Sequence, residues 1–177
     1  LSNGDQDLVM LQTAAIYAYD GFLWELGDRL TAATGRDVRG KITLSVNHSH
    51  AAPANWHKGM TWFLGGDRYN EEVFERAVTS MEQVALDAFD NLVPAAIGLG
   101  QATDWDPDDR VYSDRRGDND TLQFFDDIPA GPYKDPNLTV LRVDTADGDP
   151  MGLFYAFGMH GTALYEDNTL WSTDAPG

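Results

Sequence analysis

The sequence predicts an α/β fold with a mixed β-sheet core flanked by helices, in a single domain over residues 1–177. Two observations support this prediction. Two segments carry apolar residues at helical spacing. The segments around them either alternate apolar with polar residues or consist of short apolar runs, as strands do. A chain of 177 residues, of which 42% are hydrophobic, can bury one sizeable core. No repeat or internal linker divides it.

The first expected helix covers residues 19–34. Gly35 follows it and is a plausible end, because glycine readily adopts the left-handed conformation that closes helices. The apolar side chains of this segment share one helical face: Leu23, Leu26, Leu30 and Ala33.

The second expected helix runs from about Asn70 to Leu92. Asn70 can cap its first turn, the two glutamates that follow suit the positive end of the helix dipole, and Pro94 lies just past its end. One continuous apolar stripe is predicted to face the core: Phe74, Val78, Met81, Ala85 and Ala88.

Four segments are expected to be strands. Residues 41–46 alternate in the pattern of a half-buried strand, and residues 94–100 read as a short buried one. Residues 138–143 and 151–159 are predicted to pair around a turn at Asp147-Gly148-Asp149.

The charge balance limits the possible partners. The chain has 29 acidic and 12 basic residues, with a formal net charge of −17. Such a surface repels nucleic acid and anionic membrane faces, so we expect no nucleic-acid partner. No apolar run approaches the ~20 residues of a transmembrane helix. The acidity fits an extracytoplasmic or secreted location, or a high-salt setting, where salt screens self-repulsion, although an ordinary acidic soluble protein remains an alternative.

The histidines point to a metal site. His48 and His50 directly follow a strand-like run, and His160 closes another from Met151 to Met159. Neutral imidazole is the commonest metal ligand, and two strands can bring their C-terminal ends to one cleft. On an extended segment, alternate side chains such as His48 and His50 share one face. The chain has no cysteine, which excludes thiolate ligands and disulfides. The alternative is a structural, hydrogen-bonded histidine pair.

Other polar features have simpler interpretations. His57 lies in an expected loop beside Trp56 and is interpreted as a bystander or pocket lining. The acidic segment from Asp104 to Asp127 lacks the glycine and final glutamate of an EF-hand loop, which favours a solvated surface loop. Arg110, within that segment, would then form a surface ion pair.

Several motifs occur in one order that resembles the neutral ceramidases. Residues 41–53 are similar to that family's strand followed by T-H-T-H-S-G-P, and residues 138–143 to its T-V-L-K-F. Residues 147–150 resemble D-G-N-P, and residues 151–162 resemble N-W-F-A-V-H-G-T. Residues 168–174 are similar to N-T-L-I-S-G-D. The resemblance spans nearly the whole chain, so it predicts a portion of a larger neutral-ceramidase-like catalytic domain.

The resemblance implies a zinc-dependent amidase that hydrolyses the N-acyl bond of a ceramide-like lipid. By position, it makes His48 and His160 zinc ligands. It places His50 beside the metal, where it orients substrate or stabilises the oxyanion, and it matches Arg110 to an active-site arginine.

In that family a glutamate and a tyrosine complete the zinc site, and a serine acts as nucleophile, all further along the chain. We therefore expect a second chain or a C-terminal continuation to supply them, with residues 1–177 being a processed subunit or a trimmed fragment. Two alternatives stay open. One is an amidohydrolase-type metal-dependent hydrolase, which also uses an H-x-H pair after a strand, and the other is a non-catalytic domain with structural histidines.

Overall fold

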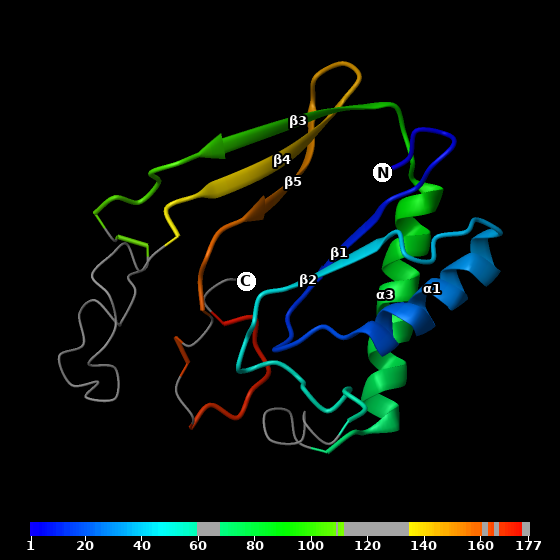
Figure 1. Ribbon diagram of the computed structural model, residues 1–177, viewed down its shortest axis with the longest axis vertical. Coiled ribbons are helices and arrows are strands. Elements are labelled where there is room, and N and C mark those ends of the chain that lie inside the picture. Colours follow the sequence, from blue (N-terminus) through cyan, green and yellow to red (C-terminus); the bar gives the residue numbers. More distant parts are fainter. Residues whose placement is uncertain (60–67, 109, 112–134, 161–162, 165–166, 175–177) are drawn as a thin grey trace. The chain divides into compact units, whose positions relative to one another are not determined.

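A computed structural model describes residues 1–59, 68–108, 110–111, 135–160, 163–164 and 167–174. It contains helices and strands in two compact units, whose elements are labelled in Figure 1. The first unit comprises Leu1–Leu92 with His160–Gly177, and the second comprises Val93–Met159. The predicted α/β class is confirmed, while the assignment of residues 1–177 to a single domain stays a prediction.

The first unit is built around a parallel strand pair. Strand β1 (Val9–Thr13) pairs with β2 (Ile42–Val46) in register from Val9 opposite Ile42 to Thr13 opposite Val46. Parallel neighbours cannot be joined by a tight turn, so the chain returns through helix α1 (Asp20–Thr34). The sequence predicted β2 and α1, and β1 was missed.

Helix α1 ends as predicted. Gly35 has φ of 70°, and its N–H donates to the Thr31 carbonyl at 3.0 Å. The buried face is centred on Phe22, Leu26 and Leu30. Ala33, which the sequence placed on that face, is exposed, because the face follows the i, i+4 row that starts at Phe22.

Helix α3 (Glu71–Asp90) also follows its sequence signals. The Asn70 side-chain oxygen accepts hydrogen bonds from the backbone N–H groups of Glu72 (2.9 Å) and Val73 (3.3 Å). The predicted stripe is buried through its first four members, Phe74, Val78, Met81 and Ala85, whereas Ala88 is exposed.

Removing the Asn70 cap should destabilise α3. Asn70→Ala is expected to lower the free energy of unfolding by about 1 kcal/mol, because two N-terminal N–H groups lose their acceptor. Asn70→Asp retains an acceptor oxygen and serves as the matched control. Urea denaturation of both variants checks this, and equal losses in the two would contradict the capping role.

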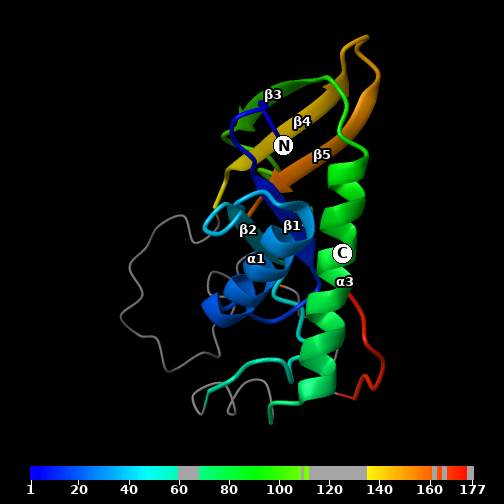
Figure 2. The ribbon, with the colours of Figure 1, turned by 90° about the vertical axis from the view of Figure 1, so that its right-hand side faces the viewer.

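The two helices lie together on one face of the strand pair, as Figures 1 and 2 both show. The apolar core of the unit lies between these elements: Val9, Leu11, Ala15, Phe22, Leu26, Leu30, Val38, Trp56, Phe74, Val78, Met81 and Ala85. At the edge of this core, Arg29 of α1 pairs with Glu25 at 2.8 Å and reaches Glu75 of α3 at 2.7 Å. This half-exposed ion pair joins the two helices.

The second unit is an antiparallel sheet in the order β3-β4-β5, formed by β3 (Ala95–Ala102), β4 (Leu138–Thr145) and β5 (Pro150–Ala156). The predicted turn joins β4 to β5, and Gly148 occupies it with φ of 92°. Parallel and antiparallel pairing thus both occur, but in two separate sheets.

The prediction that β3 is buried is wrong. All eight of its residues are exposed. Strand β3 lies at the edge of its sheet, and no described helix of this unit covers either face of the sheet. None of the described helices combines the length and apolar character needed to cross a bilayer.

Candidate metal centre

Three of the four histidines gather in the first unit. His48, His50 and His160 can each offer one ring nitrogen such that the three nitrogens lie within 4.8 Å of one another. Nε2 of His50 is 2.8 Å from Nε2 of His160. The ring of His48 lies 5.1 Å from that of His50 and 4.7 Å from that of His160, measured between centroids. The structure therefore brings together the three histidines singled out in the sequence.

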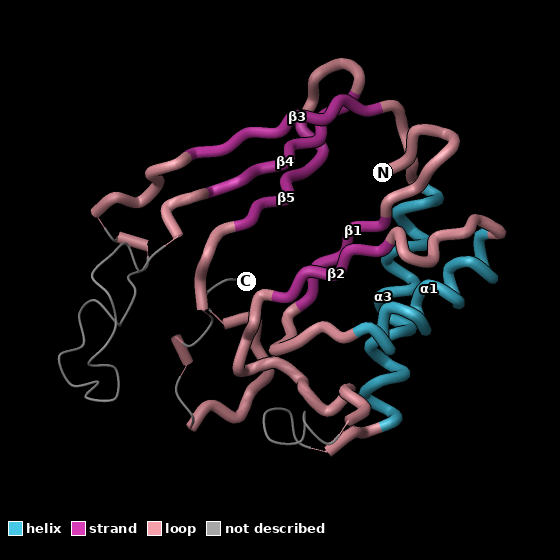
Figure 3. Tube along the Cα trace, in the orientation of Figure 1, coloured by secondary structure: helices cyan, strands magenta, loops and turns pink. Residues whose placement is uncertain are grey.

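The segments that follow β2 and β5 are loops (Figure 3). These loops, rather than the strands, position the three histidines. Strand β2 ends at Val46, and His48 has φ of 54°, a left-handed conformation uncommon outside glycine. The expectation that His48 and His50 share a face of an extended segment is therefore wrong. Likewise β5 ends at Ala156, four residues before His160.

Hydrogen bonds hold the segment after β2 against the C-terminal segment. The Asn47 side chain accepts from the Ser49 N–H at 3.2 Å and donates to the Thr173 carbonyl at 2.9 Å. The fully buried Ser49 hydroxyl donates to the Ser172 carbonyl at 2.9 Å, and Ser172 N–H donates to the Ala51 carbonyl at 2.9 Å. The loop that carries His48 and His50 is therefore hydrogen-bonded to residues 172–173 through Asn47, Ser49 and Ala51.

A backbone carbonyl sets the tautomer of His48. Nδ1 of His48 is 2.7 Å from the carbonyl oxygen of Ile16. A carbonyl can only accept, so Nδ1 carries the proton and Nε2 presents its lone pair. Metal-ligating histidines are commonly held in this way, through the ring nitrogen that does not bind the metal.

The donor set fits a zinc ion. Tetrahedral zinc bonded at 2.0–2.1 Å to imidazole nitrogens places those nitrogens ~3.3 Å apart. The ring nitrogens of the three histidines lie within 4.8 Å of one another, which accommodates this separation. Among the described residues, no carboxylate joins this cluster.

A sequence model of the family described as "Neutral/alkaline non-lysosomal ceramidase, N-terminal" matches residues 28–177. The chain belongs to this family. The resemblance inferred from the motifs is thereby confirmed, and it extends from the middle of α1 to the last residue.

Individual ceramidases are similar to the chain at low identity. Neutral ceramidase A of Dictyostelium discoideum is 22% identical over 138 residues, which cover 77% of this chain and 19% of that protein. Neutral ceramidase 2 of Arabidopsis thaliana is 26% identical over 159 residues, covering 85% of this chain and 20% of that protein. The chain thus spans about a fifth of the length of these relatives.

Solved ceramidase structures share the fold. The neutral ceramidase from Pseudomonas aeruginosa superposes with a TM-score of 0.67 at 19% identity, over 86% of this chain and 24% of that one. A structure described as ceramidase complexed with C2 gives a TM-score of 0.70 at 20% identity, over 86% of this chain and 23% of that one. The α/β architecture is that of a portion of the ceramidase fold.

The fourth histidine lies in the core of the first unit. His57 is 3% exposed, and its Nδ1 lies 3.1 Å from the Ala54 carbonyl oxygen. Its ring packs 5.5 Å from that of Tyr17 and 4.9 Å from that of Tyr19. Burial raises the pKa of the Tyr19 phenol, whose hydroxyl donates to the Trp56 carbonyl at 2.8 Å. His57 is thus a buried aromatic contact of the core, and it is not among the residues that line the pocket described below.

The structure describes Arg110 as a surface residue of the second unit. Its side chain is 82% exposed and lies 3.5 Å from the Asp108 carboxylate. Its backbone N–H donates to the Asp106 carboxylate at 2.7 Å. These contacts match the surface-loop interpretation of residues 104–108, and residues 109 and 112–127 lie outside the described part. An active-site role for Arg110 stays a prediction.

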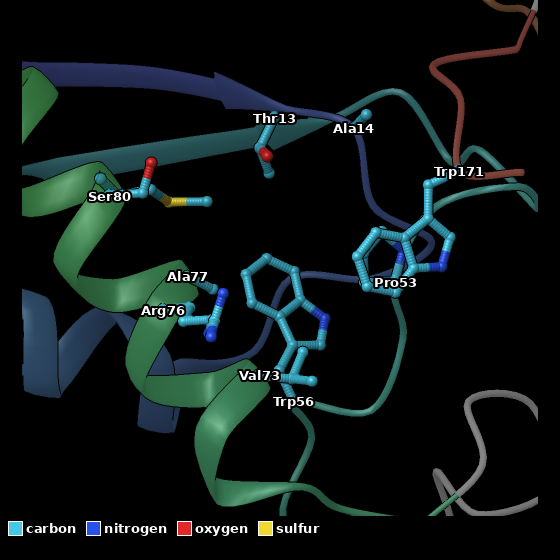
Figure 4. A pocket seen from close by; sticks show the side chains of 10 residues that line it. Thr13, Ala14, Pro53, Trp56, Val73, Arg76, Ala77, Ser80 and Trp171 are labelled. Atoms are coloured by element: carbon cyan, nitrogen blue, oxygen red, sulfur yellow. The ribbon is translucent and has the colours of Figure 1, made fainter.

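An apolar pocket of about 260 Å³ lies in the first unit, the one that holds the clustered histidines (Figure 4). Trp56, from the loop that follows the histidines, reaches into it opposite Trp171. The remaining lining residues come from β1, α3 and the loops: Thr13, Ala14, Pro53, Val73, Arg76, Ala77, Ser80 and Met81. None of the three clustered histidines lines this pocket, so the pocket and the metal centre are distinct features.

Proposed function

We propose that this chain supplies part of the active site of a zinc-dependent hydrolase that cleaves the N-acyl amide bond of a ceramide-like lipid. The observation that carries the proposal is the gathering of His48, His50 and His160 in a member of the ceramidase family. Imidazoles suit zinc, and the chain contains no cysteine that would direct it to a thiolate site.

We assign His48 and His160 as zinc ligands. The Ile16 carbonyl holds the His48 ring with Nε2 available, which is the state a ligand requires. His160 directs its Nε2 to the same place, as its 2.8 Å approach to the His50 nitrogen supports. When bound, zinc supplies Lewis-acid polarisation of the amide carbonyl.

His50 is assigned to the substrate. Its exposed ring faces the same point as the proposed ligands, where an N–H donor can hold the oxyanion that develops on the carbonyl. Arg110 is assigned a second polar role toward substrate from its sequence position in the family motif alone.

The remaining zinc ligands and the nucleophile are proposed to come from outside these residues, in a second chain or in a C-terminal continuation. Two findings support this. The chain spans only 19–20% of the length of the curated relatives, and no described carboxylate accompanies the histidines.

The net charge of −17 supports an extracytoplasmic or secreted location.

Metal removal tests the function. The intact natural protein should release fatty acid and sphingosine from an N-acylsphingosine. A zinc chelator should lower the rate at least about 100-fold, because the Lewis acid that would polarise the substrate carbonyl is lost. Added zinc should restore the rate. Mass-spectrometric product analysis measures this.

Two substrate controls separate the alternatives. An amidohydrolase-type enzyme would prefer a cyclic amide over the N-acylsphingosine, and a non-catalytic domain would release nothing from either. A rate that persists undiminished after complete zinc removal would overturn the metal-dependent mechanism.

A further inference from the structure

We propose that Tyr17 is a positioning residue for His48: its ring, which also contacts the buried imidazole of His57, keeps the His48 Nε2 aimed at the proposed metal site. The inference rests on the proposed function, in that it presumes His48 to be a zinc ligand. It assigns a role to two residues that belong to no ceramidase motif identified in the sequence.

Tyr17 and its neighbour Ile16 hold His48 at two points. The Ile16 carbonyl fixes Nδ1 at 2.7 Å. The Tyr17 ring meets the His48 ring at a centroid distance of 5.8 Å and an interplanar angle of 73°, an edge-to-face contact. A single hydrogen bond lets a ring pivot about the bonded nitrogen, and the second contact opposes that pivot.

The ring of His57 packs against the ring of Tyr17. Its ring meets the Tyr17 ring at 5.5 Å and 81°, again edge to face. It is 3% exposed and tied by Nδ1 to the Ala54 carbonyl at 3.1 Å, so it has little freedom to move. The Trp56 ring packs on His57 in turn, at 5.7 Å between ring centroids. The ring contacts that carry the proposal therefore run from the buried His57 through Tyr17 to His48.

The backbone that carries Tyr17 is itself anchored. It follows β1 directly, with Ala15 fully buried and Ile16 8% exposed. The Asn47 N–H donates to the Thr13 carbonyl at 3.4 Å, which continues the β1–β2 pairing up to the histidine loop. The left-handed backbone at His48 is uncommon for a side-chain-bearing residue, so contacts beyond the backbone are needed to hold it.

The test is zinc affinity, measured in the intact natural protein by competition with a chromophoric chelator. Tyr17→Leu keeps apolar volume but removes the aromatic ring, and it should weaken zinc binding by about 10- to 100-fold, the range for residues that orient a ligand. Tyr17→Phe restores the ring and should return the affinity to within about threefold of the parent.

Tyr19→Leu is the matched control. Tyr19 lies two residues away, and its ring contacts His57, whereas within the described part of the chain the tyrosine ring against His48 is that of Tyr17. It should lower the thermal stability while leaving zinc affinity within about threefold. Cobalt substitution gives a second readout, since the visible spectrum of the bound ion should change in Tyr17→Leu and stay constant in Tyr19→Leu.

Each outcome has one meaning. If His48→Ala weakens zinc binding and Tyr17→Leu does not, the positioning role is wrong while the metal assignment stands. If Tyr17→Leu and Tyr19→Leu weaken zinc binding equally, or Tyr17→Phe fails to restore it, the effect is general destabilisation and the proposal fails. If His48→Ala itself leaves zinc affinity unchanged, the assignment of His48 as a zinc ligand under the proposed function is wrong.

Discussion

Replacing His48 or His160 by alanine is expected to lower zinc affinity by more than about 100-fold and to abolish N-acyl amide hydrolysis. Changes to residues that merely orient a ligand cost about 10- to 100-fold, so loss of a ligand must cost more. The nitrogens of both side chains lie within the 4.8 Å cluster, and His48 is held in the tautomer that a ligand requires. Metal analysis of purified variants, with the hydrolysis rate measured on the same samples, checks the prediction.

His50→Ala is the matched comparison, because it removes an imidazole from the same cluster. We expect this variant to retain zinc and to lose hydrolysis by about 10²- to 10³-fold, the effect of removing one oxyanion donor. Zinc loss in His50→Ala equal to that in His48→Ala would make His50 a third ligand. Full zinc retention in both the His48 and His160 variants would refute the ligand assignment.

Phe22→Ala is expected to lower the free energy of unfolding of the first unit by about 3–5 kcal/mol. Phe22 is 1% exposed, and its ring packs edge-on against Trp56 at 4.8 Å and Phe74 at 5.9 Å. Truncation therefore opens a cavity where α1, α3 and the loop after β2 meet. Urea denaturation followed by tryptophan fluorescence measures the loss.

Trp24→Ala provides the control on the same helix. Trp24 lies two residues from Phe22 but is 72% exposed, so its removal should change the free energy of unfolding by less than about 0.5 kcal/mol. A loss below about 1 kcal/mol for Phe22→Ala, or equal losses for the two variants, would contradict the described core.

Local signals explain most of what the sequence predicted of the fold. Asn70 and Gly35 mark their helix ends through capping chemistry that involves only a few neighbouring residues. Strand β1 was missed because its five residues carry no turn or cap signal, and it exists through pairing with β2, 33 positions further along in register. The exposure of β3 was equally hidden, since its apolar composition does not reveal what packs against it.

The histidine cluster was predicted for a partly wrong reason. His48 and His160 do meet, but through loops rather than through two strands ending at one cleft. Asn47 and Ser49 form hydrogen bonds with residues 172–173, which are more than 120 positions away in the sequence. His48 also has a left-handed backbone conformation. Periodicity within a short window contains no such information, and neither does it reveal the contact of Tyr17 with His48.

Anomalous diffraction at the zinc absorption edge, from crystals of the intact natural protein, tests the central claim most directly. We predict one zinc peak bonded at ~2.0–2.1 Å to Nε2 of both His48 and His160, with the His50 nitrogen beside it and outside bonding distance. A zinc peak located away from these side chains, or none in a protein that hydrolyses N-acylsphingosine at full rate, would contradict the account.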